Sequence, residues 1–145
     1  MTVGYLLDLF IINQVRKDEL RDTIEADVRM DLNKQDGYLL KEIGKFLIEI
    51  ADGERPGFFA KHKQYDKNIG EPQDDNIIEV IYKLYQRHKE LWTLEDLRRD
   101  KNNSNKTRLD ACDRVSVANK KRNDLVEMID FIISRRLKES RQGRV

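Results

Sequence analysis

The sequence predicts an all-α protein: a four-helix up-and-down bundle with one long irregular loop between the second and third helices. Only 7 of its 145 residues are glycine and only 2 are proline, and both residue types interrupt helices. Apolar residues recur at steps of three and four over most of the chain, which is the pattern of helices buried along one face. The length fits a single domain that spans residues 1–145.

The balance of charges argues against a strong electrostatic attraction to polyanions. The chain has 28 Lys and Arg residues against 27 Asp and Glu, so its net charge is +1 and no long-range field draws it to nucleic acid. No stretch approaches the roughly 18 apolar residues of a membrane span. The first residues also lack the basic and apolar segments of a secretion signal. We therefore expect a cytoplasmic protein without a membrane span.

Two helices are expected before the loop. Thr2 can cap the first helix by accepting a backbone N–H, and apolar residues continue at helical spacing from Val3 to Val28. The polar segment 33–37 is expected to end this first helix. A second helix follows, and Gly53 suits the left-handed conformation that closes many helices. The apolar stripe of this second helix comprises Leu39, Leu40, Ile43, Phe46, Leu47 and Ile50.

Residues 53–75 form the longest segment without helical periodicity, and they include both prolines of the chain. A structureless loop of this length is unusual in a compact domain and is often functional or disordered. Its basic residues are interleaved with aromatic ones, a composition that can stack bases and contact phosphates. In the alternative interpretation, Phe58 and Phe59 hold the loop on the core while the lysines are solvated.

A third helix is expected to begin at Asn76, which forms a capping-box pattern with Glu79. Two polar residues, His88 and Glu95, fall within its apolar stripe rather than beside it. Isolated buried charges cost several kcal/mol, so such groups need partners or water. The stripe reads Ile77, Ile81, Leu84, His88, Leu91 and Glu95.

The last helix is expected to follow a polar break at residues 101–106. It should begin near Ser104 or Asn105 and run to about Glu139, ahead of a basic C-terminal tail at 138–145. Polar residues interrupt its stripe after Ala118, just as they interrupt the stripe of the first helix after Phe10. The interrupting residues are Asn13 and Lys17 in the first helix and Asn119, Arg122 and Asn123 in the last.

We expect these misplaced polar residues to converge where three helices meet. The planar guanidinium of Arg122 suits a bidentate pair with Glu95 or Asp96, and Trp92 would pack at the edge of the cluster. The cluster is either an internal network that fixes helix register or the lining of a pocket for an anionic or metal-bound ligand. The predicted binding residues are Asn13, Lys17, His88, Trp92, Glu95, Asp96, Arg99, Asn119, Arg122 and Asn123.

Two segments resemble known families. The opening TVGYLLDLFIINQ resembles the TVGEL-DK-I start of small helical bacterial proteins of unknown function. The segments LWTLEDLRRD and NKKRNDLVEMID are similar to the signature LW-LED-R … N-x-x-RND-x-x-E-x-ID of an uncharacterised bacterial domain family. The chain departs from the pattern at Tyr5 and Leu9, where the family usually has Glu and Lys. The matching residues are Thr2, Gly4, Asp8, Trp92, Glu95, Asp96, Arg99, Asn119, Arg122, Asn123, Asp124, Glu127 and Asp130.

The resemblance also implies a biological context. Members of such families often accompany glycosyltransferases and cell-surface polysaccharide genes, which implies an accessory role in the synthesis of surface glycans. The sequence contains no Gly-rich phosphate loop, zinc-ligand spacing or nucleophile elbow. The favoured hypothesis is therefore a non-catalytic binding or assembly protein without a cofactor. It would form a complex with a protein partner or with itself, such as a homodimer.

Two alternatives remain open at this stage. Glu127 and Asp130 resemble part of the signature of all-helical nucleotide pyrophosphohydrolases, in which carboxylates on facing helices hold magnesium; Glu95 and Asp96 would complete the set. Arg99 stands where those enzymes need an acid. The other alternative is a nucleic-acid-binding protein that uses the loop and a basic tail. The basic residues of the tail are Arg135, Arg136, Lys138, Arg141 and Arg144.

Overall fold

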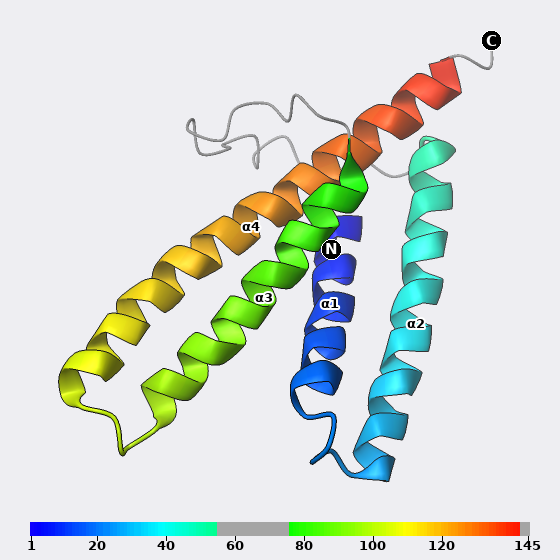
Figure 1. The fold of residues 1–145 in the computed structure, drawn as a ribbon. Helices are drawn as coiled ribbons and strands as arrows, with labels where there is room; N and C mark the ends of the chain where they lie inside the picture. The colour runs from blue at the N-terminus through cyan, green and yellow to red at the C-terminus, as the bar shows by residue number, and fades with distance from the viewer. Residues whose placement is uncertain (55–75, 143–145) are drawn as a thin grey trace.

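The computed structural model describes residues 1–54 and 76–142, and all regular structure in these residues is helical. Consecutive helices run in opposite directions (Figure 1), which confirms the predicted all-α up-and-down arrangement. The predicted loop lies almost entirely outside the described residues, as does the end of the basic tail. The four helices are α1 (Val3–Glu19), α2 (Ala26–Ala51), α3 (Ile77–Arg99) and α4 (Asn105–Gln142).

The first helix is shorter than the sequence predicts. Its start is confirmed, because the Thr2 hydroxyl accepts a hydrogen bond from the backbone N–H of Tyr5 at 3.2 Å. Its predicted extension to Val28 is wrong: α1 ends at Glu19. The carbonyl of Leu20 then accepts backbone N–H groups from the residues three and four positions later, at 3.0 and 2.8 Å. This hydrogen-bonded turn reverses the chain without a glycine or proline, so the sequence gives no obvious sign of it.

Residues 33–37 lie inside α2, so their predicted role as a helix stop is also wrong. Their polarity has another cause. The buried carboxylate of Asp36 accepts hydrogen bonds from Asn13 at 3.0 Å and from Lys17 at 2.6 Å. The polar segment therefore joins α2 to α1 instead of turning the chain. The predicted C-terminal cap of α2 is confirmed, because Gly53 has a φ of 78°.

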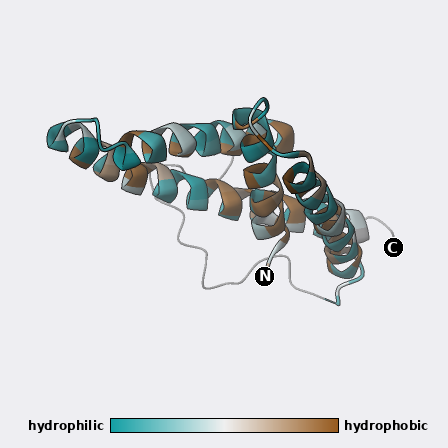
Figure 2. Ribbon diagram, turned by 90° about the horizontal axis from the view of Figure 1, so that it is seen from below, coloured by the Kyte–Doolittle hydropathy of each residue, from teal (hydrophilic) through white to brown (hydrophobic). Residues whose placement is uncertain are grey.

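The two helices of the second half form one long hairpin. Asn76 caps α3 by accepting the backbone N–H of Glu79 at 3.3 Å, as predicted, and the predicted polar break separates α3 from α4. The α3–α4 hairpin diverges from the α1–α2 hairpin toward its tip (Figure 1). In the view from below, this tip is largely hydrophilic, whereas hydrophobic residues gather where the two hairpins meet (Figure 2).

The core places α1 at the centre of the bundle. One cluster joins α1 to α3 and α4, and it includes Ile11, Leu84 and Ile129. A second cluster joins α1 to α2, and it includes Leu6 and Phe46. Full burial of one such apolar side chain contributes about 1.5–3 kcal/mol. None of the described helices is both long and apolar enough to cross a membrane.

Candidate ligand-binding cleft

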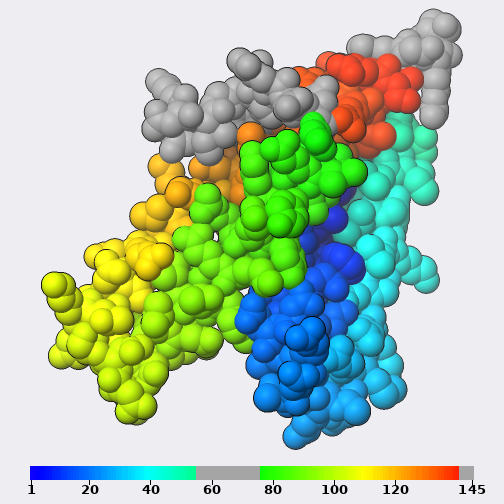
Figure 3. Space-filling view, in the orientation of Figure 1, coloured from blue at the N-terminus to red at the C-terminus, as the bar shows by residue number. Residues whose placement is uncertain are grey.

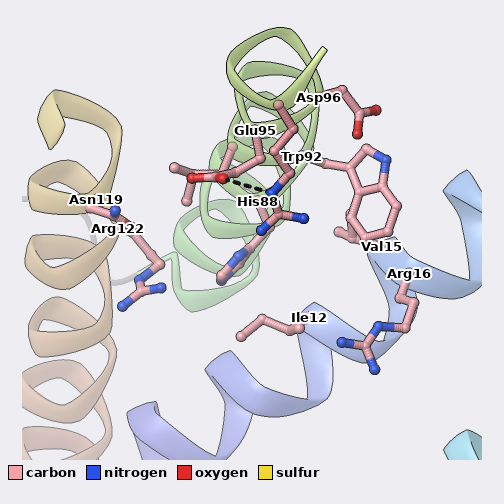
Figure 4. A pocket seen from close by; sticks show the side chains of 11 residues that line it. Ile12, Val15, Arg16, His88, Trp92, Glu95, Asp96, Asn119 and Arg122 are labelled. Atoms are coloured by element: carbon pink, nitrogen blue, oxygen red, sulfur yellow. Dashed lines mark ion pairs between the residues drawn. The ribbon is translucent and has the colours of Figure 1, made fainter. Parts of the chain in front are cut away.

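A cleft opens between the two hairpins where α3 and α4 turn away from α1. It has a volume of about 350 Å³, and Figure 3 shows the notch between the lower parts of α3 and α1. Three helices supply its walls (Figure 4). The lining residues are Ile12, Val15 and Arg16 from α1, His88, Leu91, Trp92, Glu95, Asp96 and Arg99 from α3, and Asn119 and Arg122 from α4.

Helical spacing brings most of the predicted polar cluster to this cleft. On α3, steps of three and four place His88, Trp92, Glu95 and Arg99 along the side that faces the opening. On α4, Asn119 and Arg122 are one turn apart and reach into the space that faces α1 and α3 (Figure 4). Four of the out-of-pattern residues of these two helices, His88, Glu95, Asn119 and Arg122, therefore share one cavity.

The remaining predicted residues lie elsewhere. Asn13 and Lys17 face α2, where they bind Asp36. Asn123 is exposed and does not line the cleft; its side-chain oxygen accepts a hydrogen bond from Arg122 at 3.3 Å. The sequence could not assign Asn13 and Lys17 to α2, because that assignment depends on how α1 is rotated relative to its neighbours.

Glu95 is paired along its own helix. It accepts two hydrogen bonds from Arg98, at 2.5 and 3.1 Å, and its carboxylate lies 3.5 Å from Arg99 (dashed line in Figure 4). The hydrogen bond to Glu95, together with the negative charge of that carboxylate, raises the pKa of Arg98. The charge of Glu95 is thus already compensated on α3, without the predicted partner Arg122.

Arg122 has unused hydrogen-bonding capacity. Its Nε atom is buried and has no hydrogen-bond partner in the structure, and no pair with Glu95 or Asp96 forms. A buried donor without an acceptor costs roughly 1–3 kcal/mol. Two further charges around the cleft are also uncompensated: Arg16 and Asp96 are exposed, and no side chain of residues 1–54 or 76–142 pairs with either. The cleft therefore presents polar groups that a ligand could satisfy.

His88 lies at the base of the cleft and has a partner that the sequence analysis missed. Its Nε2 atom is 2.6 Å from a carboxylate oxygen of Asp8, and both side chains are only 6% exposed. Asp8 falls in the buried stripe of α1, four residues after Gly4 and three before Ile11. That spacing was the available signal, because a charged residue within a buried stripe needs a partner on a neighbouring helix.

The alternative magnesium set is not assembled. No three His, Cys, Asp or Glu side chains within residues 1–54 and 76–142 lie close enough together to hold a metal ion. Of the four proposed ligands, Glu95 and Asp96 line the cleft, whereas Glu127 and Asp130 do not. Asp130 is buried and accepts the backbone N–H of Gly4 at 2.6 Å, so it secures the start of α1.

The alternative nucleic-acid surface is described only in part. The guanidinium of Arg135 lies over the ring of Phe131, 5.4 Å from its centroid. Arg136 and Lys138 are exposed on the last turns of α4. Residues 55–75 of the predicted basic and aromatic loop, and the side chains of Arg141 and Arg144, lie outside the described residues.

Comparison with known proteins identifies one family. Residues 78–144 match a family described as Protein of unknown function (DUF4254). Searches of curated proteins and of solved structures give no match. The matched region contains α3, α4 and most of the cleft lining, and it includes the segments whose motif resembles an uncharacterised bacterial domain family. Residues 78–144 are therefore similar to the DUF4254 family, whose function is unknown.

Proposed function

We propose that this protein is a non-catalytic binding protein and that the cleft holds a small ligand with an anionic group. The single observation that carries the proposal is the buried Nε of Arg122, which has no acceptor. A phosphate or carboxylate oxygen in the cleft would supply one. Because hydrogen bonds that involve charged groups contribute more than neutral ones, such a ligand would turn an unfavourable group into a favourable contact.

The other charges around the cleft favour the same ligand class. Arg16, Arg99 and Arg122 come from three different helices, and planar guanidinium groups suit the oxygens of phosphates and carboxylates. Asp96 and Asn119 can accept hydrogen bonds from hydroxyl groups. Trp92 supplies an aromatic surface of the kind that packs against sugars and rings. A phosphorylated sugar combines these features in one molecule.

The biological setting of the proposal comes from the resemblance stated above. Families with the matching motif often accompany glycosyltransferase and surface-polysaccharide genes. We therefore place the protein as an accessory to surface glycan synthesis, where sugar phosphates are ordinary reactants. It would bind such a compound or present it within an assembly, without converting it.

The only tryptophan of the chain makes this proposal directly testable. Trp92 lines the cleft, so its fluorescence reports ligand entry without a label. Glucose 1-phosphate and inorganic phosphate should each give a saturable change, and uncharged glucose should give none. Arg122→Gln should weaken binding by about tenfold or more, given roughly 1.5–3 kcal/mol for a hydrogen bond to a charged group. Arg114→Gln, at an exposed position on α4, is the matched control.

Two results would refute the proposal. Absence of any saturable signal with anionic ligands would remove the binding site. Equal affinity of the Arg122→Gln variant and the parent protein would remove Arg122 from it. Phosphorus NMR of the incubated mixture tests the non-catalytic part separately: glucose 1-phosphate should be recovered intact, and release of phosphate would show an enzyme instead.

A further inference from the structure

A second groove runs along the other side of α1, between α1 and α2. Its volume is about 560 Å³, and we call it the α1–α2 groove. Two residues, Ile12 and Arg16, line both this groove and the cleft, so α1 forms a wall common to the two. The side chains that define the groove are Leu9, Ile12, Tyr38 and Leu39 on its apolar surface and Arg16 and Lys34 at its edge.

The apolar part of the groove continues along the helices. Tyr5 lies one turn before Leu9 and is 46% exposed, and Tyr38 is 64% exposed. Tyr5, Leu9 and Ile12 are separated by four and three residues, so their side chains form one stripe on α1. The stripe and Arg16 extend over about three helical turns, roughly 16 Å at 1.5 Å per residue.

The charge of the groove has one sign. Its lining contains Arg16 and Lys34 and no carboxylate. Beyond this lining, Lys41 and Lys45 follow Tyr38 along α2 and are exposed, whereas Glu42 in the same stretch is half-buried. Within the described ranges, no carboxylate pairs with these lysines or with Lys34. A partner that covers the apolar surface would bring its flanking charges against these cations, so it should be acidic.

The shape of the groove favours a helix as the occupant. Two packed antiparallel helices leave a furrow between their ridges that accepts the side chains of a third helix. A partner helix presents apolar residues at steps of three and four, with charged residues on either side of that stripe. We propose that the α1–α2 groove docks an acidic amphipathic helix of a partner protein. The proposal does not rest on the buried Nε of Arg122, because Arg122 takes no part in this groove.

A synthetic helix provides the probe. An 18-residue fluorescein-labelled peptide would carry leucines at steps of three and four flanked by glutamates, and a second peptide would replace every glutamate with lysine. Fluorescence anisotropy should show saturable binding of the acidic peptide and at least tenfold weaker binding of the basic one. Lys34→Glu should weaken the acidic peptide about tenfold. Lys106→Glu, exposed in the first turn of α4, should leave it unchanged.

Several outcomes would overturn the proposal: no binding of the acidic peptide, equal binding of both peptides, or equal effects of Lys34→Glu and Lys106→Glu. Binding of a single-stranded oligonucleotide that Lys34→Glu weakens would overturn the assignment to a helix. The cleft proposal is separable, because Lys34→Glu should not change the Trp92 response to glucose 1-phosphate. Arg122→Gln should likewise not change the affinity for the peptide.

Photo-cross-linking identifies the natural occupant. A photoreactive phenylalanine analogue at Tyr38, in the host cell, should become linked to a protein segment that mass spectrometry can sequence. The linked segment should have a helical apolar stripe and an excess of Asp and Glu. A basic segment, a segment without that stripe, or no cross-linked product would contradict the proposal.

Discussion

Gly4 marks a close approach between α1 and α4. A Cβ atom at this position would lie 2.5 Å from the backbone oxygen of Val126 and 2.9 Å from the carboxyl group of Asp130. The absence of a side chain also allows the N–H of Gly4 to reach Asp130. Gly4 and Asp130 both belong to the sequence motifs that resemble known families. One contact explains both residues, because it holds the first helix against the last.

Replacing Gly4 by alanine tests this contact. Alanine favours a helix by up to about 1 kcal/mol over glycine, but here the added methyl group forces backbone atoms apart. We expect Gly4→Ala to lower the free energy of unfolding by about 1–3 kcal/mol. Gly44→Ala is the control, because nothing lies within 4 Å of its Cβ, and it should stabilise the protein slightly. Urea denaturation measures both, and equal effects at the two positions would contradict the close contact.

At the scale of elements, α1 and α3 are joined by a hydrogen bond between the side chains of Asp18 and Tyr85, among other contacts. The Tyr85 hydroxyl donates a hydrogen bond to the Asp18 carboxylate. This bond, followed by burial and the negative charge of Asp18, raises the pKa of Tyr85 to about 12 from its usual value of 10.0. Because the folded state holds the proton more tightly than the unfolded state, the bond stabilises the fold fully below pH 10.

This hydrogen bond predicts a specific pH dependence of the free energy of unfolding. The stability that Tyr85 contributes should be lost as the pH rises from about 10 to about 12. The difference in free energy of unfolding between the parent protein and Tyr85→Phe should therefore shrink across this window. Tyr82→Phe serves as the control, since Tyr82 is 59% exposed. If the parent and Tyr85→Phe differ by the same amount at pH 8 and at the top of this window, Tyr85 is not held in its neutral form.

The elements differ in how well the sequence predicted them. Both ends of α3 and the start of α4 were predictable because local signals mark them: Asn76 as a cap and a run of polar residues as a break. The end of α1 was not, because neither glycine nor proline marks the turn after Glu19. The polar residues around Asp36 resembled a loop, although they serve as partners for α1.

The site was predictable to the extent that one helix determines it. The faces of α3 and α4 follow from their periodicity, so His88, Glu95 and Arg122 stood out as polar residues within apolar stripes, and all three line the cleft. Their partners depend on how helices rotate against each other, which periodicity does not fix. Glu95 pairs with Arg98 instead of Arg122. Arg16 is exposed on α1, and it does not interrupt the apolar stripe, so the pattern of the sequence does not mark it.

At the scale of the whole molecule, the two hairpins share a core only near their junction. The tip of the α3–α4 hairpin is held by a small cluster that includes Leu91, Leu94 and Ala118 and involves no residue of α1 or α2. The junction core draws on three helices. Regions with few buried apolar contacts open at lower cost than the main core, so the tip should open independently.

Hydrogen exchange measures this difference directly. Amides near residues 106–116 of α4 should exchange faster than those near residues 125–133, which lie against the junction core. Leu94→Ala should accelerate exchange mainly at the tip, because its cluster is local. Ile129→Ala should accelerate exchange in all four helices. A uniform response to Leu94→Ala would show that the hairpins unfold as one unit.

The position of α1 has a thermodynamic consequence. Ile12 and Arg16 belong to both cavities, so an occupant of either one alters the charge and shape available to the other. Thermodynamic linkage requires this influence to be reciprocal. If a bound helix changes the affinity for a sugar phosphate by some factor, a bound sugar phosphate must change the affinity for the helix by the same factor. Since both occupants would compete for one guanidinium, each should favour release of the other. Under the two proposals above, docking of the partner helix would release the small molecule from the cleft.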